Sequence, residues 1–231
     1  MISLEELYNR LREYFGPQHW WPVDTMYHRL HGTDPRFEVI IGAILTQNTA
    51  WRNVEKALLN LKKYAPLTAE SIVSMSADTL RDLIHPSGFF NQKSKRLKDF
   101  SRYLMDSYRG DLDLFLSRDT LTIREELLSL PGIGPETADS ILLYAGNHPV
   151  FVVDAYTKRL CSRIPIPAGR TYDEIQCYFH EALTGLNNEE EKVSLYKEYH
   201  ALIVQQGKNI CRMKPICDLC CINNKCSRSL R

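Results

Sequence analysis

The stretch that decides the fold is LPGIGPETAD, residues 130–139, which sets two glycines between two helical segments. One helix is predicted to end near Leu128, and the next to open at Pro135, because proline is favoured in the first turn of a helix. Glycines let successive backbone N–H groups point the same way, and at a helix N-terminus such groups can bind an anion. The same spacing also fits a helix–helix turn that binds nothing.

The rest of the chain is predicted to be almost entirely helical. Apolar residues recur at helical spacing in four stretches, 4–14, 37–45, 54–61 and 97–104. Further helices are expected at 119–129, 134–145, 155–163, 172–184 and 189–206. Thr68, Ser76 and Asp119 lie where helix N-caps are wanted. Only PVFVV, residues 149–153, has the character of a strand, and five residues cannot form a sheet alone.

The composition is that of an ordinary globular protein. The chain has 231 residues, 44% hydrophobic and 25% charged, with a formal net charge of +1. This excludes low-complexity disorder and leaves no global positive field, so a polyanion would need a local patch. Two basic runs stand out, one after residue 200 and one formed by Lys93, Lys95, Arg96 and Lys98. The run at residues 93–98 is either a solvated face or a patch that flanks DNA. The basic residues near the cysteines either contact phosphate or compensate the charge of the thiolates.

Neither a membrane span nor a secretory signal is expected. The longest uncharged run, residues 140–153, is fourteen residues long and contains Gly146 and Pro149, whereas a helical span needs about 20 apolar residues. The opening residues MISLEELYNR hold two glutamates and no apolar core. An intracellular, cytoplasmic protein is expected.

Five of the seven cysteines fall within sixteen residues near the end of the chain. In a chain expected to be intracellular, such clustering favours a metal site over a disulfide framework. Four of them are separated by five, two and five residues: Cys211, Cys217, Cys220 and Cys226. Structural zinc usually binds two close pairs of cysteines, and only one is present here. Cys221 directly follows Cys220 and leaves the third ligand ambiguous.

Asp154 lies eighteen residues beyond Glu136, directly after the apolar run 149–153. An aspartate at this place is often only the N-cap of the helix that follows. A carboxylate at the mouth of a helix can also face a substrate, and the interval between hairpin and aspartate favours that second interpretation.

The hairpin LPGIG, followed across one helix and a Gly/Pro-rich loop by VVD, resembles the motif of the endonuclease III superfamily of DNA glycosylases, known as helix-hairpin-helix-GPD. The resemblance extends over nearly the whole chain. Residues 37–61, residues 85–96 and the sequence Trp20-Trp21-Pro22 resemble most the branch that excises alkylated purines such as 3-methyladenine.

The resemblance implies an all-α fold of two helical lobes. A central helix bundle would comprise residues 33–148 and end with the helix-hairpin-helix. Residues 1–32 and 149–231 would form the second lobe, including a C-terminal iron–sulfur cluster loop at 211–226.

The resemblance also implies roles for single residues. Asp154 would be catalytic, either stabilising the oxocarbenium-like sugar or orienting the water that attacks C1′. Trp20, Trp21, Pro22 and Trp51 would line the base pocket, where an electron-poor alkylated purine stacks on aromatic faces. Core packing is the simpler interpretation of the tryptophans.

Contacts with DNA are implied for the hairpin and for the end of the helix that begins near Phe37. The hairpin residues concerned are Gly132, Ile133, Gly134 and Thr137. Asn48, with Gln47 as the second choice, would enter the duplex and fill the space left by a flipped nucleotide. A helix C-cap is the alternative for both side chains.

Glu136 stands where bifunctional members of the superfamily carry a lysine that attacks the sugar. A carboxylate cannot form a Schiff base, so we expect a monofunctional N-glycosylase of base excision repair without lyase activity. Two alternatives stay open: an endonuclease III-like enzyme for oxidised or mismatched pyrimidines, and a non-catalytic sensor of damaged DNA. Asp154 argues against the sensor, since a pure binder gains nothing from a carboxylate facing a polyanion.

The family places a [4Fe–4S] cluster at the four spaced cysteines. The first interval here is one residue shorter than usual in the family, and zinc or a metal-free tail remain alternatives. The expected partner is double-stranded DNA containing damaged bases, bound by a monomer associated with the nucleoid.

Overall fold

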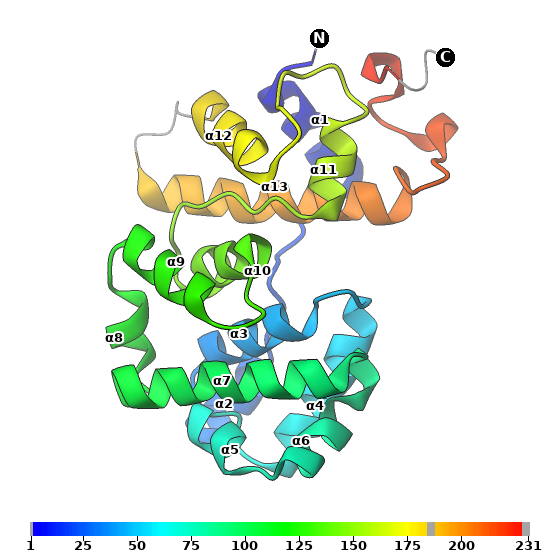
Figure 1. Cartoon of the computed structure of the whole chain (residues 1–231). Coiled ribbons are helices and arrows are strands. Elements are labelled where there is room, and N and C mark those ends of the chain that lie inside the picture. The colour runs from blue at the N-terminus through cyan, green and yellow to red at the C-terminus, as the bar shows by residue number, and fades with distance from the viewer. Residues whose placement is uncertain (1, 184–187, 228–231) are drawn as a thin grey trace. The chain divides into compact units, whose positions relative to one another are not determined.

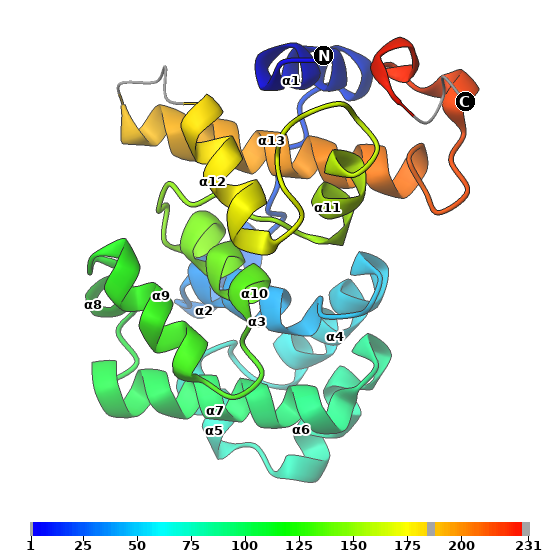
Figure 2. The same cartoon turned by 45° about the horizontal axis from the view of Figure 1, so that its top comes forward.

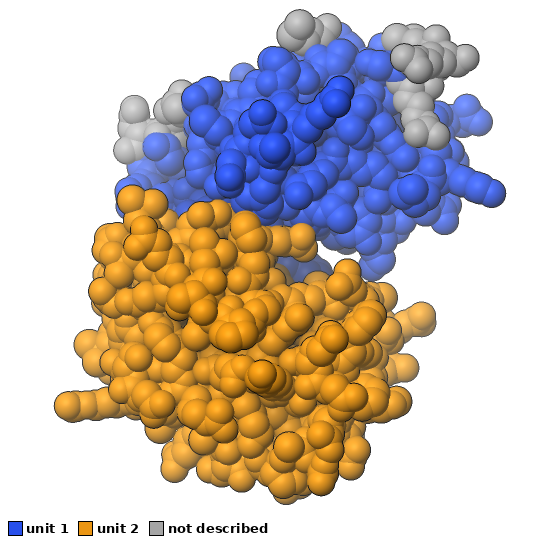
Figure 3. Space-filling view, viewed as in Figure 1, with its two compact units in different colours: residues 1–20, 147–231 blue, residues 21–146 orange. Residues whose placement is uncertain are grey.

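The computed structural model describes residues 2–183 and 188–227. Within these ranges the regular elements are all helical and no strand forms, which confirms the all-α prediction (Figure 1). The chain divides into two compact units (Figure 3). Unit 1 comprises residues 1–20 and 147–231, and unit 2 comprises residues 21–146.

Unit 2 is built around α3, Pro35–Leu45, in which every residue from Phe37 to Leu45 is buried. A helix that is apolar on all sides is covered on all sides, and α3 packs against α4, α7 and the π-helical turn η2. The elements of this unit are α2 Thr25–His31, α3, α4 Trp51–Tyr64, α5 Ala69–Ser74, α6 Ala77–Ile84, η1 His85–Ser87, α7 Phe90–Tyr108, α8 Leu112–Leu116, α9 Thr120–Ser129, α10 Pro135–Ser140 and η2 Ile141–Ala145.

Unit 1 is organised around its longest helix, α13, Glu189–Asn209, which packs against α1, Leu4–Phe15, and α11, Ala155–Cys161 (Figure 2). Its core is aromatic, with the rings of Phe151 and Phe179 stacked at 4.0 Å. The remaining elements are α12 Tyr172–Ala182, η3 Cys217–Leu219 and η4 Asn223–Lys225.

Local sequence signals account for many helix starts. The side chains of Thr68, Ser76 and Asp119 each accept a backbone hydrogen bond from the residue three positions on, which confirms the three predicted N-caps. The strand-like run 149–153 is extended but lies beside no strand. Instead Phe151 donates its N–H to His180 Nε2 at 2.9 Å, and its carbonyl accepts from Gln176 Nε2 at 2.7 Å.

Unit 2 begins at Trp21, whereas the central bundle was predicted to begin at residue 33. Two hydrogen bonds join α2 to later parts of this unit. His28 Nε2 lies 2.6 Å from Glu38 Oε2 of α3, and Tyr27 donates its hydroxyl to the carbonyl of Ala65 at 3.2 Å.

Lys93 does not belong to a solvated face, since only 1% of it is exposed. Its Nζ donates to the carbonyl of Leu45 at 2.8 Å and to that of Ser87 at 2.7 Å. These carbonyls lie at helix ends, where backbone acceptors lack a partner within the helix. Lys93 therefore ties the loop after α3 to the loop after η1.

Burial of Lys93 should make the free energy of unfolding depend on pH. Burial, with a smaller contribution from Arg96, lowers the pKa of Lys93 to about 8, whereas an unfolded lysine titrates near 10.4. Between these values the unfolded chain binds more protons, so the contribution of Lys93 to stability rises with pH. The free energy of unfolding of the wild type, minus that of Lys93→Met, should increase from pH 8 to pH 10 in denaturant titrations. The exposed neighbour in Lys95→Met should show no such trend, and equal trends would contradict the assignment.

Candidate functional site

The hairpin connects α9 to α10 and needs a glycine at one of its two glycine positions. Gly132 has a φ of 84°, and a Cβ there would lie 2.1 Å from Arg96 Nε. Gly134 has an extended backbone, and a Cβ there would meet nothing within 4 Å. The conformation of the turn therefore requires glycine at position 132. At position 134 a side chain would have space, so the turn does not require glycine there. Ile133 is buried and donates its N–H to the Leu130 carbonyl at 3.1 Å.

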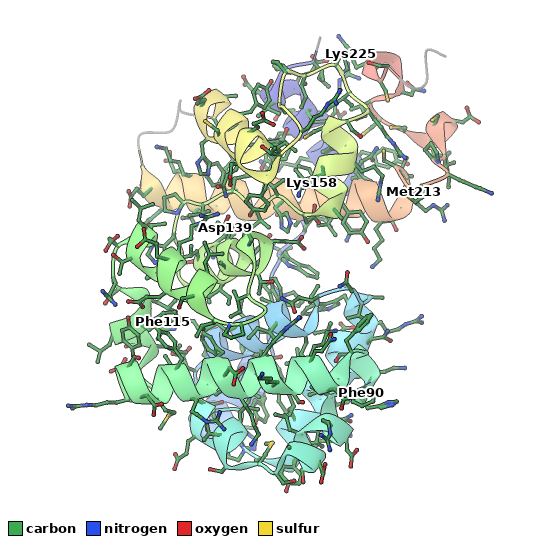
Figure 4. All side chains as sticks on the ribbon, in the orientation of Figure 1. Phe90, Phe115, Asp139, Lys158, Met213 and Lys225 are labelled. Atoms are coloured by element: carbon green, nitrogen blue, oxygen red, sulfur yellow. The ribbon has the colours of Figure 1, made fainter. Side chains whose placement is uncertain are left out.

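An ion pair with a buried carboxylate joins the two helices of the hairpin. Arg124 Nε of α9 donates to Oδ1 of Asp139 in α10 at 2.7 Å, and Asp139, labelled in Figure 4, is fully buried. Because the carboxylate has its partner on the preceding helix, the pair fixes the angle at which the chain leaves the turn.

Gln47 braces the hairpin from the loop after α3. Its Nε2 donates to the Gly132 carbonyl at 3.0 Å and to Thr137 Oγ1 at 2.8 Å, and its Oε1 accepts from Arg96. Gln47 and the buried Thr137, both predicted to contact DNA, therefore have partners within unit 2. Asn48 is exposed, and its backbone adopts the left-handed conformation with a φ of 54°.

Phe89 was missed by the sequence analysis. It lies in the loop that Lys93 ties to the loop of Asn48, is 59% exposed and has a φ of 47°. A large apolar side chain held in solvent in an unfavourable backbone conformation is the signal that marks it.

Two of the predicted base-pocket residues form an aromatic cluster in unit 2. The Trp21 ring lies 5.3 Å from that of Trp51, nearly perpendicular to it, and 5.2 Å from that of Tyr144. A Cβ on Gly42 of α3 would lie 3.1 Å from Trp21, so the glycine makes room for the indole. Tyr144 is an addition that the sequence analysis did not identify. Pro22 is exposed, and Trp20 belongs to unit 1 and is half-buried.

Asp154 is the N-cap of α11, as the simpler interpretation proposed, and it is also buried, with 8% exposed. Its Oδ1 accepts from the Thr157 N–H at 2.7 Å and from the Thr157 hydroxyl at 2.8 Å. Its Oδ2 lies 3.7 Å from Nε2 of the buried His200 of α13.

Burial on its own would raise the pKa of Asp154. The nearby imidazole of His200, followed by the two Thr157 donors, outweighs this effect and holds the pKa of Asp154 below its ordinary value of 3.8. Asp154 is therefore a buried carboxylate that stays ionised at neutral pH. The sequence analysis identified neither His200 nor Thr157 as its partners.

The cysteine loop encloses a small pocket in unit 1. All four predicted ligands line it, together with Arg163, Ile210, Pro215, Ile216 and Asn223. Cys221 does not line it. Burial raises the pKa of the Cys220 thiol, and the sulfurs of Cys211 and Cys226 raise it further.

Four thiols line one pocket, and four cysteine ligands are what a four-iron cluster takes. Among the described residues, no group of three metal-ligating side chains converges on one ion. In a four-iron cluster each cysteine binds a different iron, so the sulfurs surround a volume instead of meeting at a point.

A second pocket of unit 1 lies along α11 and is basic. It is lined by Ala155, Lys158, Arg159, Ser162, Arg163, Met213 and Ser227. Both arginines donate to backbone carbonyls, including that of Cys211. These bonds leave their positive charge in place. Lys158 and Met213 are labelled in Figure 4.

The chain is similar to known proteins over most of its length. Residues 41–184 match the HhH-GPD superfamily of base excision DNA repair proteins. The chain belongs to this superfamily. It is 44% identical over 223 residues to MJ1434 of Methanocaldococcus jannaschii, a protein assigned as a DNA repair glycosylase, covering 96% of this chain and 94% of that protein. It is 33% identical to endonuclease III of Thermotoga maritima, covering 84% and 83%.

Solved structures share the fold. H. pylori 3-methyladenine DNA glycosylase (MagIII), bound to 1,N6-ethenoadenine, has a TM-score of 0.68 and 29% identity, covering 90% of this chain and 98% of that one. Endonuclease III in a non-covalent DNA complex has a TM-score of 0.72 at 20% identity, covering 100% and 98%. The predicted superfamily is confirmed, and with it a DNA glycosylase of base excision repair. Among the residues described, no helix has the length and apolar character needed to cross a membrane.

Replacing each hairpin glycine with alanine should separate turn geometry from surface access. Gly132→Ala should lower the free energy of unfolding by about 1–3 kcal/mol, because alanine is strained at this φ and meets Arg96. Gly134→Ala should cost about 1 kcal/mol or less, since alanine is only a poorer N-cap. Denaturant titration measures both values. A loss at Gly134 as large as that at Gly132 would show that the second glycine is also needed by the turn.

Proposed function

We propose that the chain is a monofunctional DNA N-glycosylase that flips a damaged base out of duplex DNA and releases it, leaving an abasic site. The proposed substrates are alkylated purines such as 3-methyladenine. The observation that carries this choice is the cluster of Trp21, Trp51 and Tyr144, supported by the 29% identity to H. pylori MagIII.

Aromatic rings suit such a substrate because alkylation at N3 or N7 makes the purine cationic. A cation held over an indole gains about 0.5–2 kcal/mol, depending on how far it is desolvated. Trp21 and Trp51 are partly exposed, so ring surface remains available to a base. Recognition would then follow the electronic state of the ring, with few hydrogen bonds to base edges.

The protein would bind the phosphates of DNA and insert side chains from two loops into the duplex. In the described chain neither the Gly132 nor the Gly134 N–H donates a hydrogen bond, so both amides can donate to phosphate oxygens. The basic pocket along α11 offers a second phosphate contact. Asn48 and Phe89 are the exposed side chains of the loops joined by Lys93, and we assign to them the space left by the flipped nucleotide.

Asp154 would stabilise the sugar while the base leaves. An alkylated purine is already a good leaving group, so the enzyme needs little acid catalysis. The positive charge that develops on the sugar is stabilised by a fixed carboxylate whose own charge is secured by Thr157 and His200. The same carboxylate can orient the water that attacks C1′.

The chain has no lysine at the position that supplies the amine in bifunctional members. Glu136 occupies it, exposed in the first turn of α10. Lys93 is no substitute, because its Nζ is buried against two carbonyls. We therefore propose that backbone cleavage is left to a separate enzyme.

We propose that a [4Fe–4S] cluster is held by four thiolates: Cys211, Cys217, Cys220 and Cys226. When bound, the cluster supplies a covalent cross-link of the loop, which has little apolar core of its own. Arg163 supports the same loop by donating to the carbonyls of Cys211, Arg212 and Met213.

Base release identified by chromatography tests the proposed substrate. Duplexes carrying 3-methyladenine, an oxidised pyrimidine or a mispaired thymine should be compared in single-turnover reactions. Release of free 3-methyladenine without strand breaks supports the proposal. Preferential release of a pyrimidine would favour an endonuclease III-like specificity, which the identity to the T. maritima enzyme makes the leading alternative. Tight binding without any release would indicate a damage sensor.

Trp51→Ala should reduce release of 3-methyladenine by tenfold or more while leaving affinity for an abasic-site duplex nearly unchanged. Stacking acts on the base, whereas the hairpin acts on phosphates. Tyr64→Ala provides a matched control, because Tyr64 is an exposed aromatic residue at the other end of α4. Equal losses of release and binding in Trp51→Ala would mean that Trp51 only supports the core.

Asp154→Asn should abolish most activity while the protein stays folded, because asparagine is as good an N-cap as aspartate. The amide keeps the shape but loses the charge that stabilises the sugar, so affinity for damaged DNA should be kept or increased. Asp119→Asn, at the exposed N-cap of α9, is the matched control and should be fully active. Normal release by Asp154→Asn would reduce Asp154 to a helix cap.

Borohydride added during turnover should trap no covalent protein–DNA complex, since no amine is placed to condense with C1′. Strand breaks should appear only after alkali or an abasic-site nuclease. Glu136→Lys should introduce weak trapping, because it supplies the amine at the expected place. Efficient trapping by the wild type would overturn the monofunctional proposal.

A further inference from the structure

Gln206 is a fully buried polar residue that contacts both arms of the cysteine loop. It lies in the last turn of α13. Its side-chain Nε2 donates to Cys220 Sγ at 3.1 Å, and its backbone carbonyl accepts from the Cys211 N–H at 2.7 Å. Cys211 and Cys220 are both among the four cysteines of the pocket, so one residue touches the first and the third of them.

Burial of the Gln206 amide is unfavourable, and packing alone gives no reason for a polar side chain at this position. Gln206 Oε1 is buried and makes no hydrogen bond within the described part of the chain. An unsatisfied buried acceptor destabilises the folded state, and an apolar side chain of the same length would avoid that loss. The amide has one partner, the sulfur of Cys220, so the donated hydrogen bond is the interaction that distinguishes it from an apolar residue.

We propose that Gln206 is a positioning residue for the iron–sulfur cluster, designating Cys220 over its neighbour Cys221 as the third ligand and making the cluster easier to reduce. This inference rests on the proposed cluster. A donor to a ligand sulfur withdraws electron density from it, which favours the more negative, reduced state of the cluster. Cys221 neither lines the pocket nor receives this hydrogen bond.

Arg163 also approaches a ligand, with Nη1 3.1 Å from Cys211 Sγ. The same guanidinium donates to three backbone carbonyls of the loop, so its removal would disturb the loop as a whole. Gln206 makes a single side-chain hydrogen bond and is therefore the cleaner position for a test.

The test compares Gln206→Met with Gln205→Met in full-length protein purified without oxygen. Methionine keeps the length of glutamine and removes the donor. Gln205 is the adjacent residue of α13, and its side chain accepts from Asn209 instead of contacting a cysteine. Iron and sulfide content, the visible spectrum and the midpoint potential are measured for both variants and the wild type. We expect a lower midpoint potential for Gln206→Met and an unchanged one for Gln205→Met. Equal potentials in all three proteins would overturn the inference.

The hydrogen bond from Gln206 can also be detected in wild-type protein, in case Gln206→Met loses its cluster. With glutamine labelled by ¹⁵N in the side chain, pulsed electron paramagnetic resonance of the paramagnetic cluster should show coupling to a nitrogen across the hydrogen bond. Absence of that coupling would overturn it.

Serine variants test the choice of ligand. Cys220→Ser should lose the cluster and Cys221→Ser should keep it, and the reverse result would overturn the designation. Wild-type protein that binds zinc and no iron would defeat the cluster proposal itself. A wild-type cluster with no change in Gln206→Met would defeat only the role of Gln206.

Discussion

A carboxylate kept charged in the interior of unit 1 is the constraint on which the proposed chemistry depends. Removing a carboxylate from water costs several kcal/mol unless donors and an opposite charge replace the solvent. Thr157 supplies two donors, and it can do so only because α11 begins directly after Asp154. The imidazole of His200 in α13 lies 3.7 Å from the other carboxylate oxygen. Asp154 is an ordinary N-cap in sequence, and the same cap interactions keep its buried carboxylate charged.

Helix α13 serves two sites at once. His200 faces Asp154, and Gln206, six residues further on, faces Cys220. At a rise of about 1.5 Å per residue, the two contacts lie about 9 Å apart along one rigid element. Because both sites contact α13, disorder of the cysteine loop should also shift His200 and with it Asp154. This effect would add to any direct loss of DNA contacts.

The sequence predicted what is decided locally. Caps at Thr68, Ser76 and Asp119, the proline that opens α10 and the spacing of the hairpin all depend on residues a few positions apart. Partners distant in the chain were not predictable. The amide of Gln47 donates to Gly132 and Thr137, more than eighty residues away, and no local pattern indicates these partners. Lys93 looked solvated because charge indicates exposure on average, while its actual partners are two carbonyls at helix ends. Neither periodicity nor composition carries that information.

Direct titration of Asp154 tests the central claim of a buried, charged carboxylate most closely. Protein labelled with ¹³C in aspartate, with Asp154→Asn to assign the signal, can be followed by NMR from neutral pH downward. We expect the midpoint of the Asp154 carboxyl titration to lie below the ordinary value of 3.8. Protonation of Asp154 above pH 5 would show that desolvation outweighs Thr157 and His200, and would contradict its assignment as the charge that stabilises the sugar.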